Sequence, residues 1–187
     1  MTAECGSVPE PVDERAVDAC DASPAVTLTT DVSAQRCAGN YTLTRTWDAT
    51  RPPWVFVMLN PSTADQFVND PTVARCQARA RRGGAGGVIV VNLFALRSTD
   101  PKALYAANDP IGPENDDAIA QACRGAATVI CAWGKHGALA RRGNGVRTLL
   151  ASLGVMPYVL ALNRDGSPKH PLYVANAAPL QPWPIAA

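Results

Sequence analysis

The chain has 187 residues, of which 47% are hydrophobic and 18% charged, and its formal net charge is +1. This length and composition are typical of one globular domain with a core of its own. The sequence has no run of about 18 apolar residues, which excludes a membrane-spanning helix, and its N-terminus lacks the basic start and apolar stretch of a secretory signal.

The small net charge hides an asymmetry between the two ends of the chain. Residues 1–34 contain seven acidic side chains and one basic side chain, so the rest of the chain is basic. Residues 1–24, rich in Pro, Glu, Asp, Ser and Ala, are expected to be a flexible acidic leader, and 25–187 a single α/β domain. The basic part could bind a phosphate or polyanion, or its charges could be ordinary solvated surface.

Apolar runs in chain order predict the strands. The segment YTLTRTW at 41–47 alternates, which predicts a strand with one buried face, and WVFVML at 54–59 is apolar throughout, which predicts a central strand buried on both faces. Further strands are expected at 87–93, 127–133 and 156–162. The tail, 163–187, is expected to be irregular.

Helices are expected between these strands, with boundaries given by proline and glycine. Asp70-Pro71 predicts an N-cap followed by a helix over 71–82 that stops at Gly83. Further helices are expected at 101–107, 113–124 and 136–152. Alternating strands and helices predict a three-layer α/β/α sandwich with a mostly parallel central sheet and an antiparallel edge strand from 41–47.

The cysteines indicate the compartment. Six cysteines are scattered without a Cys-x-x-Cys pair, which argues against a disulfide framework or a zinc ribbon. We interpret them as reduced thiols of a cytoplasmic protein, and we expect Cys131 to lie in a core strand.

Polar side chains follow the predicted strands, where open α/β sheets bind their ligands. The candidate ligand-binding residues at these strand ends are Asn60, Pro61, Ser62, Thr63, Asn92, Phe94, Arg97, Trp133, Lys169 and His170. We therefore expect one edge of the sheet to be the functional site.

The residue types indicate the chemistry of this site. Asn60 could hold a water or the edge of a base, and Asp65 or Asp70 could activate that water. For Asp70 the alternative is a helix cap, because Pro71 follows it. His170, between two prolines, could stabilise an anionic leaving group.

Other side chains could hold the rest of a ligand. Arg75, Arg97 and Lys169 could bind a phosphate, although Arg75 could instead pair with a nearby acid. Phe94 and Trp133 could stack on a planar ring, with burial in the core as the alternative for both.

Cofactor sites have little support in the sequence. No Gly-x-Gly-x-x-Gly or P-loop pattern occurs. With only two histidines and no carboxylates beside them, a metal site is not expected. We expect neither a metal nor an organic cofactor.

Six segments, in order, resemble a family of uncharacterised bacterial proteins, domain of unknown function 1643. They are MLNPSTAD, NDPTVARC, VVNLFALRSTDP, GPENDDAI, AWGKHG and PKHPLY. The resemblance covers about residues 36–176 and implies a compact domain without an established activity.

A second resemblance is to the uracil-DNA glycosylase superfamily. The stretch FVMLNPSTAD is similar to its first active-site motif, and PKHPLY is similar to its second. The resemblance implies that Asn60 positions water, that His170 stabilises the departing base, and that Phe94, near Asn92, stacks on the base. It also implies the uracil-DNA-glycosylase-like version of the fold.

The chain departs from that superfamily at two motif positions. Ser62 replaces the glycine after Asn-Pro, and Leu172 replaces the serine of the second motif. The sequence shows no apolar wedge for opening a duplex, which usually accompanies base flipping. These departures favour a nucleoside, a nucleotide or a single strand over duplex DNA.

We therefore expect a hydrolase that cleaves the N-glycosidic bond of a nucleoside, nucleotide or nucleic acid. Two alternatives stay open, a non-catalytic module that binds a nucleotide or single-stranded nucleic acid, and an enzyme of other chemistry on a nucleobase-like ring. The expected partner is a nucleobase-containing molecule and not a membrane, and the oligomeric state is left open.

Overall fold

The computed structural model describes residues 41–64 and 69–184. They form an α/β fold around a six-stranded mixed sheet of order β1-β3-β2-β4-β5-β6. The strands are β1 (Thr42–Thr46), β2 (Pro53–Met58), β3 (Gly87–Asn92), β4 (Val129–Cys131), β5 (Tyr158–Val159) and β6 (Gln181–Pro182). The four central strands run parallel, and β1 and β6 pair antiparallel at the two edges. The predicted mostly parallel sheet and its antiparallel edge strand from 41–47 are confirmed.

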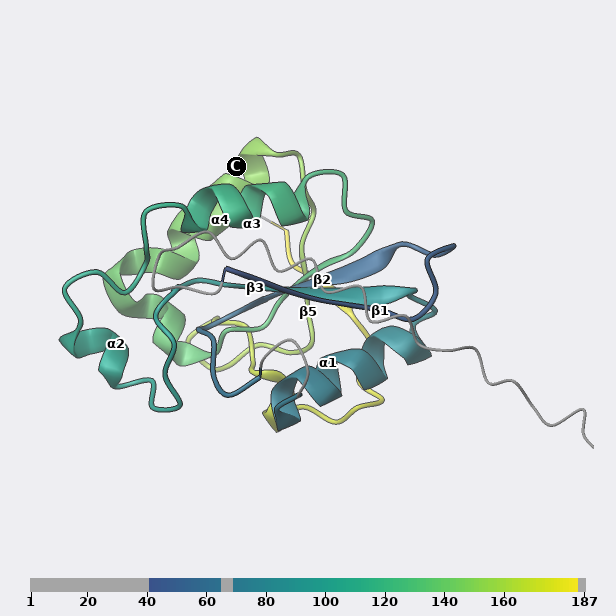
Figure 1. Cartoon of the computed structure of the whole chain (residues 1–187), viewed down its shortest axis with the longest axis horizontal. Helices are drawn as coiled ribbons and strands as arrows, with labels where there is room; N and C mark the ends of the chain where they lie inside the picture. Colours follow the sequence, from purple (N-terminus) through teal and green to yellow (C-terminus); the bar gives the residue numbers. More distant parts are fainter. Residues whose placement is uncertain (1–40, 65–68, 185–187) are drawn as a thin grey trace, which may run out of the picture.

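Helices cover both faces of this sheet (Figure 1). They are α1 (Pro71–Arg82), α2 (Ala103–Ala106), α3 (Asn115–Cys123) and α4 (Arg142–Ser152), with 3-10 helices η1 (Lys135–Arg141) and η2 (Pro171–Tyr173). The helices α3 and α4 pack on one face through Ile119 and Leu150, and α1 packs on the other through Cys76 and Ala80.

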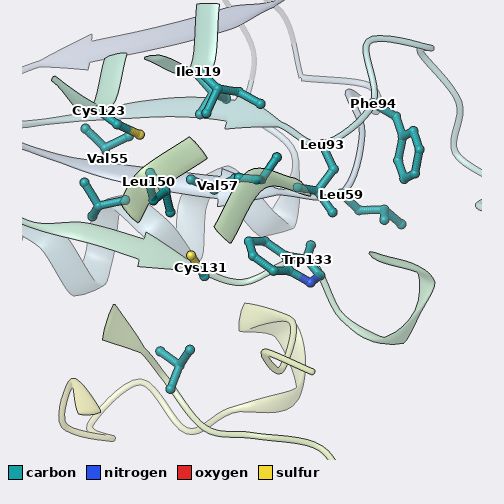
Figure 2. Packing of buried hydrophobic residues seen from close by; sticks show 14 of the residues in the cluster. Val55, Val57, Leu59, Leu93, Phe94, Ile119, Cys123, Cys131, Trp133 and Leu150 are labelled. Atoms are coloured by element: carbon teal, nitrogen blue, oxygen red, sulfur yellow. The ribbon is translucent and has the colours of Figure 1, made fainter. Parts of the chain in front are cut away.

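The continuous apolar sequence of β2 follows from its place in the middle of the sheet. Val55 and Val57 belong to the core cluster under α3 and α4, which Figure 2 shows from close by. Phe56 and Met58 alternate with them and join the cluster under α1. A strand buried on both faces has no position for a polar side chain, so the first polar residue after it, Asn60, stands where the strand has ended.

The boundaries of α1 confirm the prediction over 71–82. Asp70 caps the helix by accepting a hydrogen bond from the backbone N–H of Val73 at 2.8 Å, and Pro71 occupies the first turn. Gly83 ends the helix beside the ring of Trp54, so close that a Cβ at this position would overlap that ring.

Three predictions about the second half of the chain need correction. The helix expected at 136–152 is split into η1 and α4, because Ala140 and Arg141 adopt left-handed backbone with φ of 50° and 55°. The strand expected at 156–162 is shortened to β5, and the tail is not wholly irregular because it supplies β6.

Two further observations bear on the sequence-based expectations. Cys131 lies in β4 and, like Cys76 and Cys123, is a free and buried thiol. Within 41–64 and 69–184, no helix is long and apolar enough to cross a membrane. The predicted leader, 1–24, lies outside the described residues.

Candidate functional site

The main cleft of the molecule lies at the carboxyl ends of the parallel strands. After β2 the chain passes through α1 to β3, whereas after β4 it passes through η1 and α4 to β5. Because β3 and β5 lie on opposite sides of the adjacent pair β2 and β4, the two connections separate and open a crevice, as at the switch points of other α/β sheets. The cleft has a volume of about 700 Å³, within the range of small-molecule sites.

The cleft brings together most of the predicted site residues. Those that line it are Asn60, Pro61, Ser62, Asp70, Asn92, Arg97, Trp133 and His170. They come from the loops after four strands and from the start of α1. Their meeting at one place depends on the strand order, since Asn60 and His170 are 110 positions apart in the numbering.

Asn60 holds the cleft loops together with one end of its carboxamide. Its Nδ2 donates to the backbone oxygens of Ser98 at 2.7 Å and Pro61 at 3.0 Å, with Leu96 O at 3.4 Å. Carbonyl oxygens only accept, so the atom facing them must be the amide nitrogen. The oxygen, Oδ1, accepts no hydrogen bond within the described part of the chain, which leaves an oriented acceptor for a ligand or water.

Asn92 is a mostly buried residue whose carboxamide has no hydrogen-bond partner in the described part of the chain. It ends β3 opposite Met58, its residue is 7% exposed, and it lines the cleft. Its backbone oxygen accepts from Asn115, but its side chain makes no hydrogen bond with any residue of 41–64 or 69–184. The nitrogen and oxygen of this side chain are open to the cleft, since they are not among the fully buried polar atoms that lack a partner in the described residues. The donors and acceptor of Asn92 are therefore available to a ligand or to water.

His170 presents a neutral imidazole to the cleft. Burial lowers its pKa below the usual value, and the nearby carboxylate of Asp70 offsets part of that shift. The backbone N–H of Leu172 donates to Nδ1 at 3.4 Å, which is a long contact but places the proton of the neutral ring on Nε2. His170 can thus donate one hydrogen bond without carrying a charge.

The segment that carries His170 is fastened to α1. Arg79, only 4% exposed, donates to the backbone oxygens of Val174 at 2.7 Å and Ala175 at 2.8 Å. Arg75 adds a hydrogen bond to Val174 O at 3.2 Å. The prediction that Arg75 binds phosphate is therefore corrected, because its guanidinium holds this backbone and does not line the cleft.

Four other predicted residues are not part of the cleft as described. Phe94 is 0% exposed and packs in the core (Figure 2), so it is not a surface for stacking. Lys169 and Thr63 are not among the lining residues. Asp65 lies outside the described residues.

Trp133 forms part of the wall but not a stacking platform. It is 3% exposed and its ring packs edge-on against Trp183, with centroids 5.7 Å apart. Gly137 lies so close to this ring that a Cβ there would overlap it. A side chain enclosed in this way cannot sandwich a base, and the expected role of Trp133 is corrected accordingly.

Sequence reasoning missed several residues that line the cleft. Tyr173 is 76% exposed and its ring lies 5.9 Å from that of His170, so it is available for stacking. Lys135 and Arg164 also line the cleft. Both lie in the connections that follow β4 and β5, in WGKHG and LNRDG, and this position was the signal that could have found them.

Within the described ranges, no group of three or more His, Cys, Asp or Glu side chains could hold a metal ion. The two acids of the cleft, Asp70 and Asp165, are each engaged locally, Asp70 by Val73 N and Asp165 by Ser167. The donors of the site are therefore amides, hydroxyls, the imidazoles of His136 and His170, and exposed cations.

A family model described as protein of unknown function (DUF1643) matches residues 40–172. The chain belongs to the DUF1643 family. The matched region runs from the start of β1 into η2 and includes every residue that lines the cleft except Tyr173. No curated protein and no solved structure matches the chain. None of these comparisons supports the resemblance to the uracil-DNA glycosylase superfamily, which stays a hypothesis.

Proposed function

We propose that the cleft binds a nucleobase-containing ligand and hydrolyses its N-glycosidic bond. One observation carries this proposal, namely that the unpaired carboxamide of Asn92, the free oxygen of Asn60 and the neutral imidazole of His170 line one cleft. This set offers donors and acceptors without a metal, which suits a planar heterocycle.

Carboxamides are well matched to the edges of nucleobases. A side-chain amide carries a donor and an acceptor side by side and can pair with two adjacent base atoms, as in Asn–adenine contacts. Asn92 has both groups available, and Asn60 adds an acceptor. The exposed ring of Tyr173 can stack on the bound base.

The same groups can assist departure of the base. When the bond between C1′ and the base nitrogen breaks, its electron pair goes to the base, and Nε2–H of His170 can donate to the charge that develops. One positioned donor of this kind is worth about 3–4 kcal/mol in the transition state. Water then bonds to C1′, and one of its protons ends on the base nitrogen.

Two groups could orient that water. Asn60 Oδ1 is a fixed acceptor, and Asp70 uses one carboxylate oxygen to cap α1 through Val73 N, which leaves the other for a water proton. Asp65 remains the second acid of the hypothesis.

The resemblance to the uracil-DNA glycosylase superfamily supports this assignment, in which the residue that positions water comes first along the chain and the residue that assists the leaving base comes second. Asn60 follows the first parallel strand and His170 follows the last one, and helices cover both faces of the sheet between them. On this ground we infer a glycosylase-like three-layer fold, in which Ser62 and Leu172 replace the expected glycine and serine.

A non-catalytic binding module is the second candidate. It is favoured by the engagement of Asp70 as a helix cap, because the carboxylate oxygen that accepts from Val73 N is not free to take a proton from water. In this case the same carboxamides would recognise a nucleobase without turnover.

Release of free base, measured by chromatography, tests the proposal. The protein would be incubated with nucleosides, nucleotides and base-modified single- and double-stranded DNA, beside Asn60→Ala and Asn144→Ala, which changes an exposed asparagine of α4. The account expects release by the wild type and Asn144→Ala, and loss in Asn60→Ala. Saturable binding without release would establish the binding module, and neither binding nor release would overturn both.

A further inference from the structure

Three cations line the mouth of the cleft, and each comes from a different loop. Arg97 follows β3, Lys135 follows β4 and Arg164 follows β5. All three are exposed, whereas the carboxamide of Asn92 is nearly buried. The cleft therefore combines a nearly buried, uncharged amide among apolar side chains with exposed cations.

The cations are not neutralised by the acids of the cleft. Within the described residues, none of Arg97, Lys135 and Arg164 has a carboxylate oxygen within 4.0 Å, since the ion pairs there are Arg51–Asp48 and Arg142–Asp116. The hydrogen bonds from the hydroxyl and then the backbone N–H of Ser167 lower the pKa of Asp165 most, and the charge of Lys135 adds the least.

The two carboxylates that line the cleft are occupied by other donors. Asp165 accepts from the backbone N–H of Ser167 at 3.0 Å and from its hydroxyl at 2.6 Å. Asp70 accepts from Val73 N. Three cations thus face two engaged acids, which leaves an excess of positive charge at the mouth.

One of the cations is also held in place. A guanidinium nitrogen of Arg97, Nη2, donates to the backbone oxygen of Ala64 at 3.2 Å, which leaves its other donors open. A guanidinium fixed on one side can offer a paired fork to an oxyanion.

We propose that the ligand is phosphorylated and that Arg97, Lys135 and Arg164 hold its phosphate. This inference rests on the proposed function, because it places the base at the amide floor and the phosphate at the mouth. The site then selects nucleotides over nucleosides. A free nucleotide and the terminal residue of a single strand offer the same chemistry at this position.

Calorimetric titration of the full chain separates these possibilities. The probes are the ribo- and deoxyribonucleosides, their 5′-monophosphates and short single-stranded oligonucleotides. The proteins are the wild type, the double variant Arg97→Ala/Arg164→Ala, and Arg124→Ala/Arg82→Ala, which removes two exposed cations outside the cleft.

We expect a monophosphate to bind at least tenfold more tightly than its nucleoside, since each charge-assisted contact to an oxyanion contributes appreciably. The cleft variant should lose this preference and the control variant should keep it. Tight binding only by oligonucleotides, again lost in the cleft variant, would identify a strand as the source of the phosphate.

Two outcomes would overturn the inference. Equal affinity for a nucleoside and its monophosphate would show that the three cations do not bind the phosphate, and it would leave the proposed function unaffected. An equal loss of affinity in the two double variants would show a general charge effect. If no probe binds the wild type, the proposed function itself fails, which is a different result from either.

Discussion

Two asparagines meet at the end of β3, Asn92 as its last residue and Asn115 from α3, and their side chains make different contacts. Asn115, on α3, is 0% exposed and donates from Nδ2 to the backbone oxygens of Asn92 at 3.0 Å and Leu93 at 2.8 Å. Asn92 is nearly as buried, but its side chain faces the cleft and has no partner among the described residues. Asn115 uses its amide nitrogen to fix the end of β3, although its Oδ1 is buried without a partner in the described residues, whereas the carboxamide of Asn92 is open to the cleft.

The same contrast extends to the arginines around β3. Arg142, 7% exposed, donates from Nε to Leu93 O at 2.7 Å and forms an ion pair with Asp116. Arg97, which follows Leu93 by only a few residues in the sequence, is exposed and lines the cleft. Arg142 thus fixes the end of β3 on the side of α3 and α4, whereas Arg97 is available to a ligand on the cleft side. Substitutions in the two regions should therefore differ in the size of their effect on stability.

Arg142→Met is expected to have the largest effect on stability. It removes a charged hydrogen bond to Leu93 O and the ion pair with Asp116, which is itself well exposed and screened. We expect the free energy of unfolding to fall by about 2–3 kcal/mol, measured by urea titration. The exposed neighbour Arg141→Met is the control, and equal effects of the two variants would contradict the structural role.

Asn115→Leu should come next. The change keeps the number and branching of the side-chain heavy atoms but leaves the carbonyl of Asn92 without this donor, while Leu93 O keeps Arg142. A loss of about 2 kcal/mol is expected in the same titration. The control is Asn144→Leu, on the exposed side of α4, which should change stability little. An unchanged stability of Asn115→Leu would contradict the structural role of Asn115.

Asn92→Leu should have a smaller effect on stability. Replacing an amide that is open to the cleft and has no partner among the described residues is expected to change the free energy of unfolding by no more than about 1 kcal/mol, while ligand binding is lost. Thermal and urea unfolding of the ligand-free protein measure the first effect. A destabilisation as large as that of Asn115→Leu would show that Asn92 has a structural partner after all.

The smallest effect concerns pH and His170. Because burial lowers its folded pKa below the unfolded value of about 6.5, the unfolded chain binds a proton that the folded chain does not. Stability should therefore decrease as the pH falls through about 6.5 and level off below the folded pKa. In His170→Gln this part of the pH dependence should disappear, and an unchanged profile would refute it.

The sequence predicted the elements that depend on local signals. Apolar runs gave β2 and β3, and Asp70-Pro71 gave the start of α1, since a cap and a helix turn involve only neighbouring residues. The break at Ala140 and Arg141 was not predictable, because neither is a residue type that favours left-handed backbone. The pairing of β6 with β5 was missed because it depends on contacts with a distant segment.

The candidate site was predicted in position more reliably than in composition. Strand ends of a parallel sheet meet at one edge, so Asn60, Asn92 and His170 could be placed together from their order alone. Exposure could not be read in the same way. Phe94 and Trp133 are aromatic residues at strand ends that turn into the core, whereas Tyr173 stays exposed at the cleft.

Titration of one nucleotide panel into the wild type and Asn92→Leu is the most direct test of the central claim, that the unpaired amide of the cleft exists for a ligand. We predict saturable binding of at least one nucleotide to the wild type, and no measurable binding to the variant, which should fold with nearly unchanged stability. Equal binding by both proteins would contradict it.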